Sequence, residues 1–127
     1  MAITAQFVAT PKVGLFNISV ANTDLTGAGT IGTVFSAGAD GSRIERCVVK
    51  ATGTTTAGMV RLFIHNGTAA TLLTEIPIAA VTPSGTRPAF ETTLVFDGGL
   101  VIPAGYSLCA ATHNAESFQL TALGGDF

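Results

Sequence analysis

Residues 59–78 read MVRLFIHNGTAATLLTEIPI, and this stretch carries the clearest folding signal in the chain. Within it, Val60, Leu62 and Ile64 alternate with other residues, so they would point to one face of a β-strand and form part of a core. Asn66-Gly67 follows directly and indicates a two-residue hairpin, because a type I′ turn needs positive φ at both central positions. We therefore expect two strands, Met59–Asn66 and Ala70–Ile78, joined by a tight turn.

The rest of the chain repeats this pattern of short strands. Runs rich in Val, Ile, Leu, Phe and Thr are separated by Gly, Asn, Asp, Pro and Ser, and no window has helical spacing of apolar residues. Besides the hairpin, the expected strands are Leu15–Ala21, Thr30–Ser36, Arg43–Ala51, Phe90–Asp97, Leu100–Pro103, Tyr106–Thr112 and Ser117–Leu123. The sequence thus predicts an all-β, single-domain antiparallel β-sandwich of eight or nine strands.

The predicted turns and loops indicate how the strands are connected. Asp97-Gly98-Gly99 is expected to reverse the chain, and so is Pro103-Ala104-Gly105. The stretch Val81–Pro88 holds two prolines and a glycine and reads as a long loop. A long connection between groups of strands favours a Greek-key or jelly-roll-like topology over a meander. Residues 1–14 form either an arm that packs on a neighbour or an ordered edge segment, and residues 15–127 form the sandwich.

Charge is sparse for a chain of this size. Six Lys and Arg plus eight Asp and Glu make 11% of the 127 residues, whereas 47% are hydrophobic and the mean hydropathy is +0.53. A folded chain of 12.8 kDa keeps roughly 6,300 Å² of accessible surface, or about 450 Å² per charge. Ordinary soluble surfaces are more highly charged. We therefore expect part of the surface to be covered by another subunit.

Composition also argues against several classes of partner. A net charge of −2 and the lack of a Lys/Arg cluster give no reason to expect nucleic acid. The longest charge-free run, Gly98–Ala115, is interrupted by Gly, Pro, His and Asn, so no membrane segment is expected. The first residues lack a basic region followed by an apolar one, which predicts no secretory signal and assembly in a cytoplasm.

No catalytic, cofactor or metal site is predicted. His65 and His113 are too few and too far apart in sequence for a known ligand spacing. Gly27, Gly29 and Gly32 match a dinucleotide fingerprint in letters, but we expect a strand after them where the fingerprint needs a helix. Cys47 and Cys109 both fall in predicted strands, and we expect two free, buried thiols rather than a disulfide.

Two groups of residues are candidates for protein contacts. Arg61, Phe63 and His65 share the face of their strand opposite Val60, and a cation, an aromatic ring and an imidazole together are typical of interfaces. The alternative is that a loop of the same subunit covers Phe63. Phe7, in the N-terminal arm, is the second candidate.

Two other strands differ in their outward faces. In Phe90–Asp97 one side is apolar and the other polar, as in an ordinary solvated strand. In Ser117–Leu123 the outward side is uncharged, so it suits either water or a subunit. The missing charge is therefore concentrated on particular faces.

Several segments resemble a family of small virion proteins of tailed bacteriophages. These segments are Lys50–Gly67, Leu72–Pro77, Gly99–Leu108, Thr112–Phe118 and Gly124–Phe127, and the resemblance covers roughly residues 30–127. Within such phages the chain looks like capsid decoration (cement) proteins or other head and tail accessory proteins. The resemblance implies a β-sandwich, oligomeric packing and no enzymatic activity, and it identifies no functional residue.

The sequence therefore favours a non-enzymatic virion protein, assembled in the host cytoplasm, that stabilises the phage head. Its expected partners are copies of itself, in a trimer, and the major capsid protein or another virion protein. The alternative is a tail-fibre or receptor-binding module, or a carbohydrate-binding sandwich. The absence of Trp and the presence of one Tyr, Tyr106, argue against sugar binding.

Overall fold

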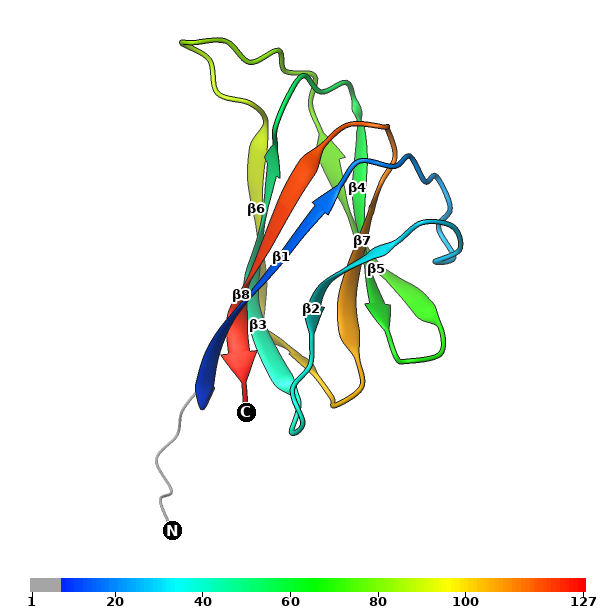
Figure 1. Ribbon diagram of the computed structural model, residues 1–127, viewed down its shortest axis with the longest axis vertical. Coiled ribbons are helices and arrows are strands. Elements are labelled where there is room, and N and C mark those ends of the chain that lie inside the picture. Colours follow the sequence, from blue (N-terminus) through cyan, green and yellow to red (C-terminus); the bar gives the residue numbers. More distant parts are fainter. Residues whose placement is uncertain (1–7) are drawn as a thin grey trace.

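A computed structural model describes residues 8–127 of the chain, and all of its regular structure is β. Eight strands form two four-stranded sheets that pack face to face (Figure 1). Their bounds are β1 Thr10–Ile18, β2 Gly32–Ser36, β3 Ser42–Ala51, β4 Gly58–His65, β5 Ala70–Ile78, β6 Glu91–Ile102, β7 Ser107–Thr112 and β8 Phe118–Asp126. Every pair of neighbouring strands is antiparallel.

The strand order identifies the topology. One sheet, here sheet A, has the order β1-β8-β3-β6, and the other, sheet B, has the order β2-β7-β4-β5. Only the β4–β5 hairpin stays within one sheet, and every other connection crosses from one sheet to the other. This interleaving of two Greek keys is the jelly roll, so the predicted fold is confirmed.

One predicted turn is wrong. Asp97-Gly98-Gly99 does not reverse the chain, because β6 runs through it and pairs with β3 on both sides. The extra residues form a bulge between Val95, which pairs with Arg46, and Leu100, which pairs with Ile44. Gly98 and Gly99 accommodate the bulge with φ of 75° and 83°, a region that other residues rarely adopt. The nine predicted runs are consequently eight strands.

The β4–β5 hairpin is present, but its turn is not type I′. Among residues 8–127 only glycines have positive φ, so Asn66 lacks the conformation that a type I′ turn requires. The loop instead spans residues 66–69 and closes with a hydrogen bond from Asn66 N to Ala69 O. Asn66 Oδ1 accepts hydrogen bonds from Thr68 N and Ala69 N, each 2.9 Å. The side chain thus replaces the backbone geometry that was predicted.

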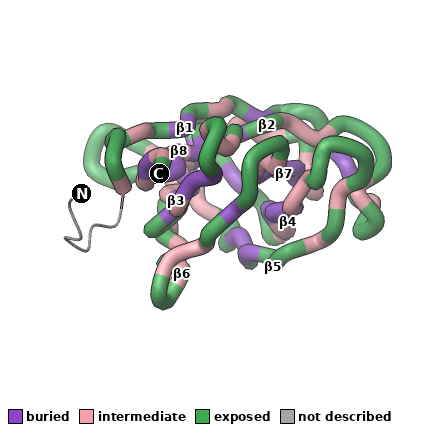
Figure 2. Tube along the Cα trace, turned by 90° about the horizontal axis from the view of Figure 1, so that it is seen from below, coloured by how far each residue is buried: buried purple, intermediate pink, exposed green. Residues whose placement is uncertain are grey.

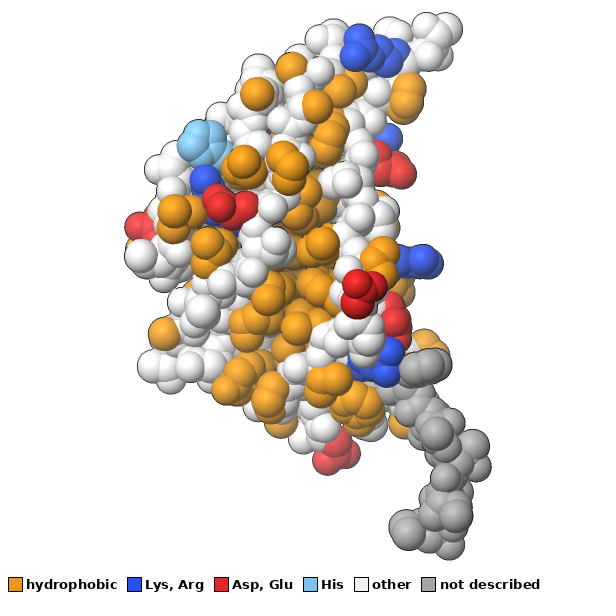
Figure 3. All heavy atoms as spheres, turned by 180° about the vertical axis from the view of Figure 1, so that it is seen from behind, with side chains coloured by type: hydrophobic (Ala, Val, Ile, Leu, Met, Phe, Trp, Pro, Cys, Tyr) orange, Lys and Arg blue, Asp and Glu red, His pale blue; other side chains and the backbone are white. Residues whose placement is uncertain are grey.

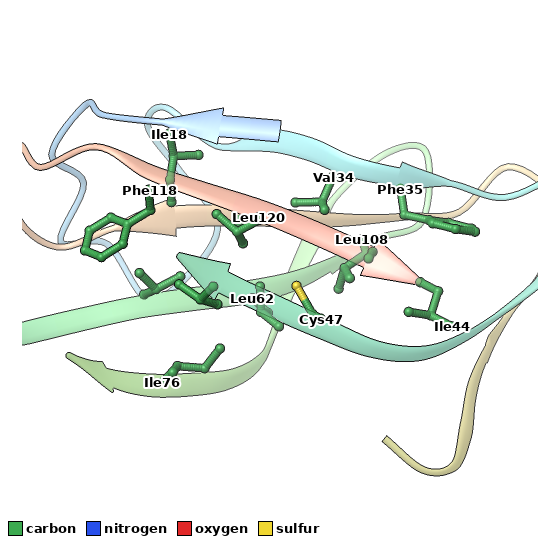
Figure 4. Close-up of a cluster of buried hydrophobic side chains, with 14 of the residues drawn as sticks. Ile18, Val34, Phe35, Ile44, Cys47, Leu62, Ile76, Leu108, Phe118 and Leu120 are labelled. Carbon is green, nitrogen blue, oxygen red and sulfur yellow. The ribbon is translucent and has the colours of Figure 1, made fainter. Parts of the chain in front are cut away.

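The core lies between the sheets. Figure 4 shows inward side chains from both sheets, including Ile44 and Leu120 from sheet A and Leu62 and Leu108 from sheet B. All four are at most 1% exposed. Figure 2 shows that buried residues line the space between the sheets, while exposed residues occupy the loops and outer faces. Alternation along each strand therefore sorts the side chains as predicted.

One long side of the sandwich is closed by small residues. β1 and β2 contact each other there without being paired. A Cβ at Gly14 would lie 2.2 Å from the carbonyl oxygen of Val34, and one at Gly32 would lie 1.9 Å from the ring of Phe16. Both sites accept only glycine at this approach. β1 begins at Thr10, so residues 10–14 form part of the edge strand of sheet A.

The two thiols are free and buried, as predicted. Cys47 lies in β3 within the main core, and Cys109 lies in β7 within a second cluster that also holds Phe63 and Ala111. Burial raises the pKa of the Cys47 thiol to about 11, so this group stays protonated at neutral pH.

Candidate interaction surfaces

The outer face of sheet A carries a patch of exposed apolar side chains. Strand pairing places Val13, Leu123, Arg46 and Val95 in one row across the sheet. The adjacent row holds Leu15, Thr121, Val48 and Thr93. Leu15 is 71% exposed, Val95 60% and Val13 55%. Because these two rows contain a single charged residue, Arg46, we call them the sheet A patch.

Two ion pairs lie at the ends of this patch, and one charged residue, Arg46, lies within it between Leu123 and Val95. At one end Lys50 Nζ lies 3.6 Å from Glu91 Oε1, and at the other Arg43 Nε lies 2.8 Å from Glu45 Oε1. Surface ion pairs of this kind contribute little to stability. A largely apolar surface that includes an Arg and has ion pairs at its edges has the composition of a protein contact surface. The uncharged outward side of Ser117–Leu123, which the sequence left open, lies in the middle of it.

The outer face of sheet B is covered by the chain itself. Phe63 points to this face and exposes no surface, since Ile31, Ala70 and Leu72 pack around it and its buried neighbours. Ile31 belongs to the loop of residues 19–31, which connects β1 to β2. Phe63 is therefore covered by its own subunit, which is the alternative given for it above. The ring of Phe63 is not available to a partner.

Asn22 organises this covering loop. Its side chain is 8% exposed, and Nδ2 donates to the carbonyl oxygens of Ala28 and Thr30 at 2.8 and 2.9 Å. Oδ1 accepts from Asp24 N at 3.0 Å, and the Asn22 backbone N donates to Thr112 O at 2.8 Å. Gly27 and Gly29, the first glycines of the fingerprint match, lie in this loop. A strand, β2, begins at Gly32, so the helix that a dinucleotide site requires is not there.

Asp24 fixes the tip of the same loop. Its Oδ1 accepts hydrogen bonds from both the hydroxyl and the backbone N of Thr26, each 2.6 Å. The hydroxyl of Thr26 is the main cause that lowers the pKa of the Asp24 carboxyl below its ordinary value. The loop is thus held at two points, a buried amide and an exposed carboxylate.

Arg61 and His65 are also engaged within the subunit. Arg61 is 7% exposed, and its Nε donates to Glu75 Oε1 at 2.8 Å. Its Nη1 lies 3.4 Å from His113 Nδ1. The half-buried His65 accepts a hydrogen bond from Gly67 N at Nδ1, 3.0 Å away. Whether His65 contacts a partner stays a prediction, and Phe7 lies outside the described residues.

The other long side of the sandwich forms an apolar groove. β5 and β6 end the two strand orders there and do not pair with each other. The groove has a volume of about 360 Å³. Its lining consists of Leu73 and Thr74 of β5 and of Leu94, Val95, Phe96, Asp97, Gly99 and Leu100 of β6. Figure 3 faces this side and shows hydrophobic side chains in a stripe along the opening. We call it the β5/β6 groove.

In residues 8–127 no group of three His, Cys, Asp or Glu side chains could hold a metal ion. The same part of the chain has no helix with the length and hydrophobicity needed to span a bilayer. The surfaces that stand out are the sheet A patch and the β5/β6 groove.

Sequence reasoning missed the sheet A patch because its members come from four strands. Val13 and Leu15 alternate with Gly14 and Phe16, a period-2 signal that the sequence does contain. Pro11 and Gly14 lie among these residues and are unfavourable in strands, so this period-2 signal did not lead to a predicted strand before Leu15. The groove has no sequence signal, because it depends on which strands end the two sheets.

Comparison with known proteins gives few matches. No protein-family model matches the sequence, and no curated protein matches it. Two crystal structures of a pentameric capsid protein isolated from metagenomic phage sequences are similar to it, each with 15% identity and a TM-score of 0.37. The match covers 87% of this chain and 61% of theirs, so the chain spans less than two thirds of their length. A likeness this distant carries no assignment of function.

Proposed function

We propose that this chain is a non-enzymatic structural protein of a tailed-phage virion. Within the virion it is a capsid decoration, or cement, protein that stabilises the head from outside. Its partners are copies of itself, in a trimer, and the major capsid protein or another virion protein. The sequence resemblance and the jelly-roll fold support this proposal, and the sheet A patch is the main structural observation on which it rests.

The patch fits a docking surface of moderate strength. Burying a Val or Leu side chain fully contributes about 1.5–3 kcal/mol, and Val13, Leu15 and Val95 are each more than half exposed. Together they would contribute roughly 3–5 kcal/mol when covered. Association costs at least about 4 kcal/mol, so one copy of the patch binds weakly. Three copies in one oligomer would bind a repeating lattice much more tightly through multivalency.

The test uses purified virions from the phage that encodes the chain. Mass spectrometry is expected to find the protein in stoichiometric copies relative to the major capsid protein. Purified protein is also expected to pellet with virions that lack it, and to sediment alone as a trimer. Absence from virions and failure to pellet would refute the proposal, whereas a pentamer in solution would correct the oligomeric state alone.

The receptor-binding alternative receives no support from the aromatic residues. Tyr106, the only Tyr of the sequence, is half buried and packs against the main core. It therefore does not offer a ring to a sugar. A glycan array with this protein is expected to give no binding.

A further inference from the structure

The β5/β6 groove has the features of a site for an extended peptide. Its lining is mostly apolar, and it lies between two strand edges that pair with nothing in residues 8–127. Free strand edges readily accept another strand, and natural proteins usually protect or occupy them. Adding a peptide strand to such an edge gives affinity through the backbone and specificity through alternate side chains.

The partly buried core residues beside the groove also favour an occupant. Leu94, Phe96 and Leu100 point toward the core but remain only half buried, because no strand within residues 8–127 continues the sandwich beyond β6. On the opposite long side, where β1 approaches β2 closely, Phe35 is 1% exposed, although Phe16 is half buried. An apolar segment in the groove would complete the core on the open side.

The chain itself contains a segment of suitable chemistry. Residues 1–7 read MAITAQF and carry no charged side chain. In an extended conformation Met1, Ile3, Ala5 and Phe7 would point to one side, and the residues between them to the other. An uncharged segment with alternate apolar residues suits a groove whose lining is mostly apolar and has one charged side chain, Asp97.

Geometry excludes the subunit's own groove as the place for Phe7. Ala9 N is hydrogen-bonded to Asp126 O at 2.9 Å, and Val8 packs beside Gly125, so the chain is fixed at the β1 edge of sheet A. β6 lies three strand spacings away in the same sheet, about 14 Å at ~4.8 Å per spacing. One residue spans at most about 3.6 Å, so Phe7 cannot cross from Val8 to that edge.

We propose that residues 1–7 of one copy occupy the β5/β6 groove of a neighbouring copy, extended alongside β6, with Ile3 and Phe7 inserted. This inference rests on the proposed self-association and names the contact that produces it. Because the donor and the acceptor surfaces differ, the contact is heterologous and closes into a ring when the rotation between copies allows it. The sheet A patch meets the groove at Val95, and its residues on β1, β8 and β3 remain free to bind the capsid.

The first test introduces a charge on either side of the segment in the full-length protein. Phe7→Asp places a carboxylate in the groove, and Gln6→Asp, the matched control, places the same charge on the outward side. Sedimentation velocity over a concentration series is expected to show association at least ~10-fold weaker for Phe7→Asp and within about threefold of wild type for Gln6→Asp. Equal behaviour of the two variants would overturn the inference.

The second test maps the contact directly. Chains carrying Phe7→Cys are mixed with chains carrying Leu73→Cys, a groove residue that is 38% exposed, and then oxidised. A crosslink between the two chains is expected, and it should exceed that obtained with Thr93→Cys, which lies on the outer face of β6. Crosslinking no stronger than with Thr93→Cys would overturn the inference, and so would a link formed within one dilute chain that carries both substitutions.

The outcomes separate this inference from the proposed function. A wild-type chain that oligomerises equally well with Phe7→Asp refutes the arm contact alone. A chain that depends on Phe7 for oligomerisation but is absent from virions refutes the virion role alone. A wild-type chain that stays monomeric at every concentration refutes the arm contact together with the trimer.

Discussion

Leu15 offers the sharpest test of the sheet A patch. Its side chain is 71% exposed, so it contributes little to folding but would be covered by a docked capsid. Full burial of a Leu side chain contributes about 1.5–3 kcal/mol, so the exposed part corresponds to ~1–2 kcal/mol per contact. Leu15→Ser should therefore weaken a single contact roughly 5- to 30-fold. If three contacts act together, the loss reaches about 3–6 kcal/mol, or roughly 10²- to 10⁴-fold.

The assay is pelleting of the purified variant with virions that lack the protein. Leu25→Ser is the matched control, because Leu25 is 49% exposed but lies in the loop that covers sheet B. Both variants should unfold within about 0.5 kcal/mol of wild type, since the changes are at the surface. Leu15→Ser binding as tightly as wild type, or no more weakly than Leu25→Ser, would show that the sheet A patch does not face the capsid.

Three further predictions concern stability and reactivity. Asn22→Ala removes three hydrogen bonds of a side chain that is 8% exposed, and should lower the free energy of unfolding by roughly 2–4 kcal/mol in urea titrations. The control Asn17→Ala, at an exposed site, should lower it by less than ~0.5 kcal/mol. The hydroxyl of Ser42, with Lys12, lowers the pKa of the Asp126 carboxyl below its ordinary value of 3.8. The ionised carboxylate of Asp126 therefore stabilises the fold above pH 3.8, and this stabilisation is lost as the pH falls through the lower folded pKa. Asp126→Asn should flatten this part of the stability profile, and an unchanged profile would contradict the assigned contacts. Cys47, with its pKa raised to about 11, should resist alkylation at pH 8 in the native protein and react on unfolding, as mass spectrometry of the labelled peptides would show.

Local pattern predicted most of the strands but not how they are continued or joined. Ala70–Ile78 is predicted with its observed bounds, because alternation and turn residues define it locally. The Asp97-Gly98-Gly99 segment has the composition of a turn and is instead a bulge, because pairing with β3 holds the chain on both sides of it. Glycine with positive φ serves both purposes, so the sequence alone does not distinguish them.

For the candidate contact residue Phe63, local pattern predicted the side of the strand but not what covers it. Alternation placed Phe63 on the face opposite Leu62, and this is correct. It did not show what covers that face, since the loop of residues 19–31 reaches it through Asn22 and its bond to Thr112, far along the chain. Phe63 was therefore taken as a contact residue although its own subunit buries it.

What the sequence by itself determined is the class of fold and the shortage of charge. Period-2 alternation, turn residues and the lack of helical spacing are local properties, and together they specify an all-β sandwich. Which faces stay uncovered was decided by the tertiary structure. The order β1-β8-β3-β6 brings Val13, Leu123 and Val95 into one row, and among the described strands it leaves β6 without a partner on the side of the groove. Strand register and order depend on contacts between distant segments, so no single stretch of sequence contains them.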